Sequence, residues 1–564
     1  MLTDVLSIWP KWRATAVIGL IGLVNVLSFL QQMPDHDLTG WDARVLRNWH
    51  EYGYGRLHGR VVINPGGIAP GEGVQVYPGY RGFSLLPLYV LYSATGSLWR
   101  SRLIFLVLLT LGLSFSIWRI LGQTATALAT ATALCLSPGF LRWGIAWDPV
   151  PGTVFLGMPI ILALVSAANP VTHPKSTGLL ALITLMTILY AQIEWGAVFA
   201  LFVGWCALLV LLWPGNRLRL ALITVALLIA VQFGAVLLIR QKSGHDASGH
   251  GFNELIAYFR EYNFGKGGYG KGQITWSLAL KRLAAASSVG LAPLWIVLAV
   301  VVGSVWHRLR SGVVVRLLPL AAALFAGLAM RNSMAEHQWI PCSFVGLGIL
   351  LSLQLLWQPP FHSSATSIAR PVTESTWFLA LLIVAAFAYG RIIGGINRTK
   401  DAKMNALLSL VENHTPRPAT VCLGPDLEEQ FPIERAGPML DRHVHSLTTC
   451  PEAGDGQPSF IVNSKALPDY GPPVATATPR EDPLWAHVLA WYTSHVTHRK
   501  QTEFLQCSSY FLYERYRAHN YSQHRQSDPL SNHPPEFATV FPASCSDIQQ
   551  PFPQQDAASS SSSP

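Results

Sequence analysis

Two carboxylates and an arginine stand close together just after the first apolar segment of the chain. That segment ends near residue 32, and Asp37, Asp42 and Arg47 follow it. A carboxylate in this place can deprotonate a hydroxyl group or hold a divalent cation. The alternative is that Asp37 is an ordinary loop residue and that Asp42 caps a helix. On the first interpretation, Asp37 and Asp42 are the candidate catalytic residues.

Five further residues are candidates for binding a substrate or its phosphate. Each lies at or near the end of an apolar segment, where a charged side chain is costly and therefore often functional. Cations in such places can stabilise a phosphate as negative charge develops on it. Anchoring at the membrane surface is the alternative for each of them. The candidates are Arg81, Glu194, Arg282, Arg331 and His337.

The composition indicates which elements must position these residues. The chain has 564 residues, of which 50% are hydrophobic and 13% charged, and its mean hydropathy is +0.32. A soluble globular protein has about 25% charged residues. A cytosolic enzyme, a disordered protein, a coiled coil and a small disulfide-rich protein are therefore excluded. The composition predicts an all-α polytopic membrane protein.

The net charge of +9 does not indicate a nucleic-acid partner. Lys and Arg stand in small groups between apolar segments, as in the loops that set the orientation of membrane helices. No basic stripe interleaved with aromatic residues is present, so we expect no nucleic-acid binding. The groups are Lys11 with Arg13, Arg100 with Arg102, Arg217 with Arg219, and Arg308 with Arg310 and Arg316.

Apolar runs long enough to cross a membrane recur along the chain, and we count about twelve. The run at 84–98 is short, and Pro138, Pro149 and Pro151 interrupt the region 124–168. An N-terminus inside and a C-terminus outside require an odd number, so about eleven or thirteen spans are expected. The runs lie near 14–32, 84–98, 103–121, 124–141, 147–168, 177–193, 195–213, 218–239, 287–306, 312–330, 339–357 and 376–395.

The same patterns predict how the chain is divided. A mixed, smaller soluble domain follows the last apolar run, and a Ser-rich tail predicted to be disordered follows that domain. Four cysteines fall in the soluble part, Cys422, Cys450, Cys507 and Cys545, and are disulfide candidates on an oxidising side of the membrane. The predicted parts are a first transmembrane helix (1–33), a first external loop with an interfacial helix (34–83), a transmembrane core (84–239), an external loop (240–286), further transmembrane helices (287–397), the C-terminal soluble domain (398–548) and the tail (549–564).

Residues 42–52 predict an amphipathic helix within the first external loop. Leu46 and Trp49 share an apolar face at helical spacing, whereas Arg44 and Arg47 fall elsewhere. Such a helix would lie flat in the membrane interface.

The order of these elements resembles the GT-C superfamily of membrane glycosyltransferases, in the branch of the protein O-mannosyltransferases and the aminoarabinose transferase (a glycosyltransferase family 39-like pattern). The family's first external loop carries an acidic residue, a helix with an Ala-Arg-Asn-like run, a Gly-containing turn and a Tyr-x-x-His/Lys-Pro-Pro-Leu motif. The last motif is not present as such, and Arg81 takes the place of its cation. The matching positions are Asp37, Val45–Asn48, Tyr52–Gly55, Tyr77–Gly82, Leu85–Leu88, Gln192–Trp195 and Arg331–His337.

The resemblance implies transfer of a sugar from a polyprenyl-phosphate donor to an envelope glycan, lipid or protein at the outer face of a bacterial inner membrane. Its implied partners are membrane lipid and the lipid-linked sugar, and its implied cofactor, where one is used, is Mg²⁺ or Mn²⁺ held by Asp37. Two alternatives stay open: a non-catalytic carrier or glycan-assembly partner, and a family member that kept the fold and lost the chemistry. Carriers are often built from paired repeats, and no convincing internal repeat is found.

Overall fold

The computed structural model of the chain divides into two compact units, Met1–Gly394 and Gly395–Pro564, and the division falls close to the predicted boundary at residue 398. Each unit is described by itself. The structure describes residues 11–32, 41–64, 66–68, 74, 82–145, 149–169, 177–193, 195–213, 215–243, 275–309, 311–329, 340–357, 376–417, 419–430, 440–450, 459–464, 473–477 and 510–514.

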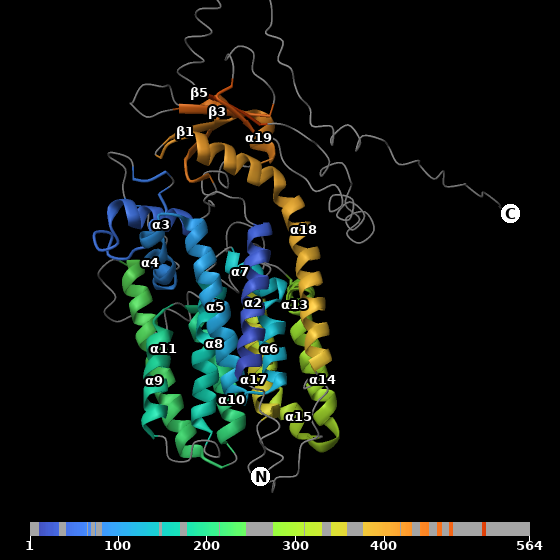
Figure 1. Ribbon diagram of the computed structural model, residues 1–564. Helices are drawn as coiled ribbons and strands as arrows, with labels where there is room; N and C mark the ends of the chain where they lie inside the picture. Colours follow the sequence, from blue (N-terminus) through green and yellow to red (C-terminus); the bar gives the residue numbers. More distant parts are fainter. Residues whose placement is uncertain are drawn as a thin grey trace, which may run out of the picture. The chain divides into compact units, whose positions relative to one another are not determined.

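The first unit is a bundle of apolar helices, so the prediction of a mostly helical chain is confirmed (Figure 1). Each predicted apolar run contains helix. The helices are α2 (Lys11–Gln32), α3 (Trp41–Tyr52), α4 (Leu86–Thr95), α5 (Leu98–Ile120), α6 (Ala125–Cys135), α7 (Pro138–Ile145), α8 (Pro149–Ala168), α9 (Thr177–Ala191), α10 (Trp195–Leu212), α11 (Arg217–Ser243), α13 (Trp276–Gly290), α14 (Ala292–Leu309), α15 (Ser311–Arg316), α16 (Leu318–Ala329), α17 (Ile340–Trp357) and α18 (Thr376–His414), of which the last continues into the second unit.

Three helices of the described residues are long and apolar enough to cross a membrane. They are Lys11–Leu30, Leu98–Ile120 and Arg217–Val236, with mean hydropathies of 1.8, 2.1 and 2.1. The pair α13 and α14 would count as a fourth if the two helices, bent by 86°, form one span. In the remaining helices the described apolar stretches have 10–17 residues each, fewer than the roughly 20 that cross a bilayer. The chain has the helices of a membrane protein, and a count of about eleven to thirteen stays a prediction.

Several of the predicted runs are interrupted in the structure, among them 124–141, 287–306 and 312–330, of which the last is divided at Leu317 between α15 and α16. The run 124–141 breaks at Leu136 and Ser137, where Pro138 opens α7 because proline lacks the N–H that a first helical turn leaves free. The Ser137 hydroxyl accepts a hydrogen bond from the N–H of Phe140 at 3.3 Å. The side chain of Asn25 donates to the carbonyl of Cys135 at 3.0 Å. The broken ends are thus capped from within the protein, as an interior without water requires.

The run 287–306 also differs from the predicted continuous span. It is divided between α13 and α14, which meet at Leu291. The indole of Trp295 donates to the carbonyl of Ser287 at 3.2 Å and so satisfies a backbone group at the bend. A Cβ at Gly139 of α7 would lie 3.0 Å from the carbonyl oxygen of Gly290. The two interrupted helices therefore meet backbone to backbone, which a larger residue at position 139 would prevent.

The second unit contains a five-stranded mixed sheet in the order β2-β1-β3-β5-β4. Strand β1 is parallel to β2 and β3, whereas β5 is antiparallel to β3 and β4. The mixed C-terminal part predicted from the sequence is confirmed in this respect. The elements are β1 (Thr420–Leu423), α19 (Pro425–Gln430), β2 (His443–Ser446), a 3-10 turn (Leu447–Thr449), β3 (Ser459–Asn463), β4 (Ala475–Ala477) and β5 (Tyr510–Glu514).

The two faces of this sheet are covered by different parts of the chain. Val421 of β1 and Phe460 and Val462 of β3 belong to one buried cluster with Leu407 and Val411 from the end of α18. This follows from the alternation of side chains along a strand, which sends successive residues to opposite faces. Cys422 and Ile461 point to the other face and pack with Leu447 and Cys450.

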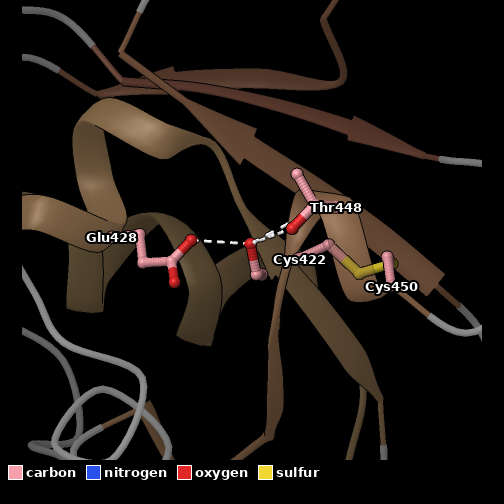
Figure 2. Close-up of a disulfide and its surroundings, with 5 residues drawn as sticks. Cys422, Glu428, Thr448 and Cys450 are labelled. Atoms are coloured by element: carbon pink, nitrogen blue, oxygen red, sulfur yellow. Dashed lines mark hydrogen bonds between the residues drawn. A yellow bond between two sulfur atoms is a disulfide. The ribbon is translucent and has the colours of Figure 1, made fainter.

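A disulfide joins Cys422 to Cys450 on that second face (Figure 2). The Ser446 hydroxyl beside it donates to Glu428 Oε2 at 2.6 Å and lies 2.9 Å from the Thr448 hydroxyl. The turn after β2 is therefore tied both covalently and by hydrogen bonds to β1 and α19. The candidates Cys507 and Cys545 lie outside the described residues.

We expect reductant to release two thiols from this pair. Denatured protein labelled with a maleimide should carry label on Cys422 and Cys450 only after reduction, as measured by mass spectrometry of tryptic peptides. The internal controls are Cys135, Cys206 and Cys342, which are free and buried and should label without reductant once the chain is unfolded. Labelling of Cys422 before reduction would show that the pair is open.

Candidate functional site

Helix α3 lies at one end of the bundle (Figure 1). Ala43, Leu46 and Trp49 are fully buried, in agreement with the apolar face predicted from the sequence. Arg44 and Arg47 are also buried, with 4% and 9% of their surface exposed. The polar residues in the middle of α3 are therefore buried, whereas His50 and Glu51 at its end are exposed, and a position of the helix in the membrane interface stays a prediction.

The polar residues of α3 are buried because they bind the backbone that follows. We call residues 60–64 and 66–68 the strap. Arg44 Nη1 donates to the carbonyl of Ile63 at 2.8 Å, and Asn48 Nδ2 donates to the carbonyl of Val62 at 3.0 Å. These donors are four residues apart and so share one face of the helix. They satisfy backbone carbonyls that an extended segment cannot pair by itself.

Aromatic residues extend the same contact. The indole of Trp49 donates to the carbonyl of Arg60 at 2.7 Å, and the N–H of Ile68 donates to the Tyr52 hydroxyl at 2.8 Å. Tyr89 of α4 donates to the carbonyl of Trp49 at 3.3 Å. The strap, α3 and α4 therefore form one hydrogen-bonded block. Each such bond stabilises by about 1 kcal/mol, and a donor lost from a buried site costs more.

A buried ion pair connects α3 to the bundle. Asp42 in the first turn of α3 pairs with Arg102 of α5, and the two side chains are 9% and 3% exposed. Arg102 Nε has no hydrogen-bond acceptor among the described residues. Removal of one partner from such a pair leaves an uncompensated charge and costs about 3–5 kcal/mol. Asp42 is thus a residue that positions α3, and its carboxylate is engaged by Arg102.

The sequence grouped Arg102 with Arg100 as cations that flank a span. The structure separates them, since Arg100 is exposed and Arg102 is inside the protein. Arg102 is the residue at this site that sequence reasoning missed. Its only signal is its place directly before the predicted apolar run 103–121, at a span end where an unpaired cation is costly.

The other predicted site residues are distributed as follows. Arg282 is half-buried on α13, which packs against α7, α16 and α17. Asp42 is the one predicted site residue that the structure places in the block around α3. The residues Asp37, Arg81, Glu194, Arg331 and His337 lie outside the described residues.

What the described residues around α3 offer chemically is a loop whose side chains are held in position. In the described part of the chain no group of three or more His, Cys, Asp or Glu side chains gathers as a metal site would require. Tyr54 lies in the turn after α3, and its pKa is raised by burial and by the neighbouring Tyr89. The hydroxyl of Tyr54 therefore stays protonated near neutral pH and can act as a hydrogen-bond donor.

The comparisons with known proteins add no relative: neither a family model nor a curated protein matches the chain.

We expect Asp42→Asn to destabilise the protein by about 3 kcal/mol or more, because Arg102 then keeps a buried charge without a counter-ion. The measurement is thermal unfolding of the purified protein in detergent. The control is Arg119→Gln, a change from a charged side chain to an amide on the exposed surface of α5. Equal melting temperatures for the two variants would contradict the proposed role of the pair.

Proposed function

We propose that the chain is a GT-C-like membrane glycosyltransferase that moves a sugar from a polyprenyl-phosphate donor to an acceptor in the cell envelope. The observation that carries the proposal is the block formed by α3, the strap and α4 directly after the first membrane helix. A loop with this much internal hydrogen bonding positions side chains as a transferase site requires. The order of first helix, acidic connection, buried helix and second hydrophobic segment supports the same class.

The structure favours Asp37 over Asp42 as the carboxylate that does the chemistry. A general base must reach the hydroxyl whose proton it takes, and Asp42 is buried against Arg102. Asp37 belongs to the connection between α2 and α3. In this proposal Asp37 activates the acceptor or holds the divalent cation, and Asp42 holds the helix that follows.

The phosphate of the departing lipid requires cations, and Arg81 is the first of them. Its neighbour Gly82 lies against α3, since a Cβ there would come within 2.8 Å of the Trp49 ring. Gly82 also has a φ of 76°, a conformation that favours glycine. The chain at position 82 is thus fixed beside α3. Glu194, Arg282, Arg331 and His337 remain candidates for the rest of the donor.

The proposed topology has about eleven passages through the bacterial inner membrane. The predicted run at 84–98 is the one to omit, because α4 has 10 residues and ends at Gly96 in a left-handed cap. A helix of this length covers roughly 15 Å, half of a hydrocarbon core. An odd count places the C-terminal unit on the outer side if the N-terminus is inside. The disulfide of that unit fits an oxidising compartment.

A second candidate function is a carrier of lipid-linked sugars without transfer chemistry. The observation that favours it is the meeting of two interrupted helix pairs, α6 with α7 and α13 with α14, inside the bundle. Interrupted helices build the binding sites of many transporters. In this molecule the described broken ends are capped by protein groups such as Asn25 and Trp295.

Asp37→Asn separates the two candidates. We expect it to lower sugar transfer from a polyprenyl-phosphate donor by at least about a hundredfold, because the acceptor loses its base. Thermal stability should stay unchanged, since loop carboxylates contribute little to it. Arg119→Gln, on the exposed surface of α5, is the control and should transfer normally. Undiminished transfer by the Asp37 variant would overturn the assignment, and absence of transfer in the unsubstituted protein would favour the carrier.

The topology has its own test in intact cells. After mild reduction, a membrane-impermeant maleimide should label Cys450, which is partly exposed and bonded to Cys422. Cys206, buried in α10, should stay unlabelled as the control. Labelling of Cys450 that appears only after the membrane is permeabilised would place the C-terminal unit inside.

A further inference from the structure

The turn that follows α3 is a compact backbone structure with three residues of positive φ. Gly53, His58 and Gly59 have φ values of 88°, 54° and 64°. Backbone hydrogen bonds close the turn at 3.0 Å from Gly59 N to the Tyr54 carbonyl and at 3.1 Å from His58 N to the Gly55 carbonyl. Glycine adopts such angles freely, whereas histidine does so at a cost. His58 is therefore held in a conformation that its own side chain does not favour.

Aromatic rings pack against this turn. A Cβ at Gly59 would lie 2.8 Å from the Tyr54 hydroxyl, so the tyrosine ring covers the turn directly. Tyr54 stacks on Tyr89 of α4 with ring centroids 5.7 Å apart, and Trp49 meets Tyr54 edge to face at 4.9 Å. Because the turn rests on this aromatic cluster, its outward side chains are presented from a rigid base.

Those outward side chains are hydrogen-bond donors, and the two arginines among them are charged. Arg56 and His58 are exposed and Arg60 is partly exposed. The described residues give none of the three an ion-pair partner. The nearest described carboxylate along the chain, Glu51, has both oxygens 3.7 Å from the Cβ position of Gly67 and so faces the strap. Three hydrogen-bond donors on a strained, rigid turn, for which the described residues supply no neutralising carboxylate, have the composition that an anion site requires.

We infer that the turn 53–60 binds the phosphate group of a lipid, with Arg56 and Arg60 as the charged donors and His58 between them. The inference deepens the proposed function, on which it rests, because a polyprenyl phosphate is the lipid that a sugar transfer releases. The chemistry fits, since guanidinium groups bind phosphate oxygens in a planar, two-pronged geometry. The positions i, i+2 and i+4 on a closed turn allow more than one donor to reach one phosphate.

The test is a binding measurement on the full-length protein in detergent micelles, and it needs no transfer assay. The probe is a short-chain polyprenyl phosphate, compared with the matching polyprenol, phosphatidylglycerol and inorganic phosphate, with retention measured by native mass spectrometry. We expect the polyprenyl phosphate to bind, and Arg56→Gln with Arg60→Gln to weaken binding by about tenfold or more. The control Arg119→Gln changes an exposed arginine of α5 and should bind as the unsubstituted protein does.

A third variant separates binding from folding. His58→Gly removes the imidazole and relieves the unfavourable backbone angle, so we expect unchanged or higher thermal stability with weaker phosphate binding. Equal affinity for polyprenol and polyprenyl phosphate, or unaltered affinity in the double arginine variant, would overturn the inference. Competition by inorganic phosphate as strong as that of the lipid would overturn the assignment to a lipid. If these variants lose phosphate binding but the unsubstituted protein transfers no sugar, only the proposed function is contradicted.

Discussion

The arrangement at the end of the bundle depends on one buried ion pair, between Asp42 of α3 and Arg102 of α5. A pair of this kind contributes little net stability, because desolvation of both charges offsets their attraction. Its main effect is to fix the position of α3. An arginine inside an apolar helix has few acceptable partners, so it selects one orientation of α3. In that orientation Arg44, Asn48 and Trp49 donate hydrogen bonds to the strap.

The apolar helices were predictable because hydropathy and length act on each segment alone. A run of apolar residues buries its backbone polar groups as helix wherever it lies, so α2, α5 and α11 follow from the sequence directly. The breaks were harder. Pro138 indicated the interruption before α7. The bend between α13 and α14, in contrast, depends on contacts with other helices, such as that of Gly139 with Gly290. Such contacts leave no local signal in the sequence.

The site shows the same division between local and distant causes. The spacing of Leu46 and Trp49 predicted the helix and its apolar face, and both residues are buried. The burial of Arg44 was not predictable, because its acceptor is a backbone carbonyl of the strap, and a carbonyl is the same at every position. In the C-terminal unit, the cysteine count suggested bridges, whereas the pairing of Cys422 with Cys450 follows from the face of β1 on which Cys422 lies.

Arginines near a membrane surface therefore cannot be assigned from residue type and spacing alone. Arg102 pairs with a carboxylate and Arg44 donates to a backbone carbonyl. Residue type and spacing alone would have assigned both as cations that could bind a ligand. Arg56 differs from them because of the backbone that carries it. The turn uses its carbonyls internally, rests on Tyr54 and Tyr89, and leaves the guanidinium exposed. In this protein, a structural arginine donates its guanidinium hydrogen bonds to the local backbone, whereas a binding arginine keeps these donors exposed. Which of the two applies depends on the conformation of the turn that carries the arginine.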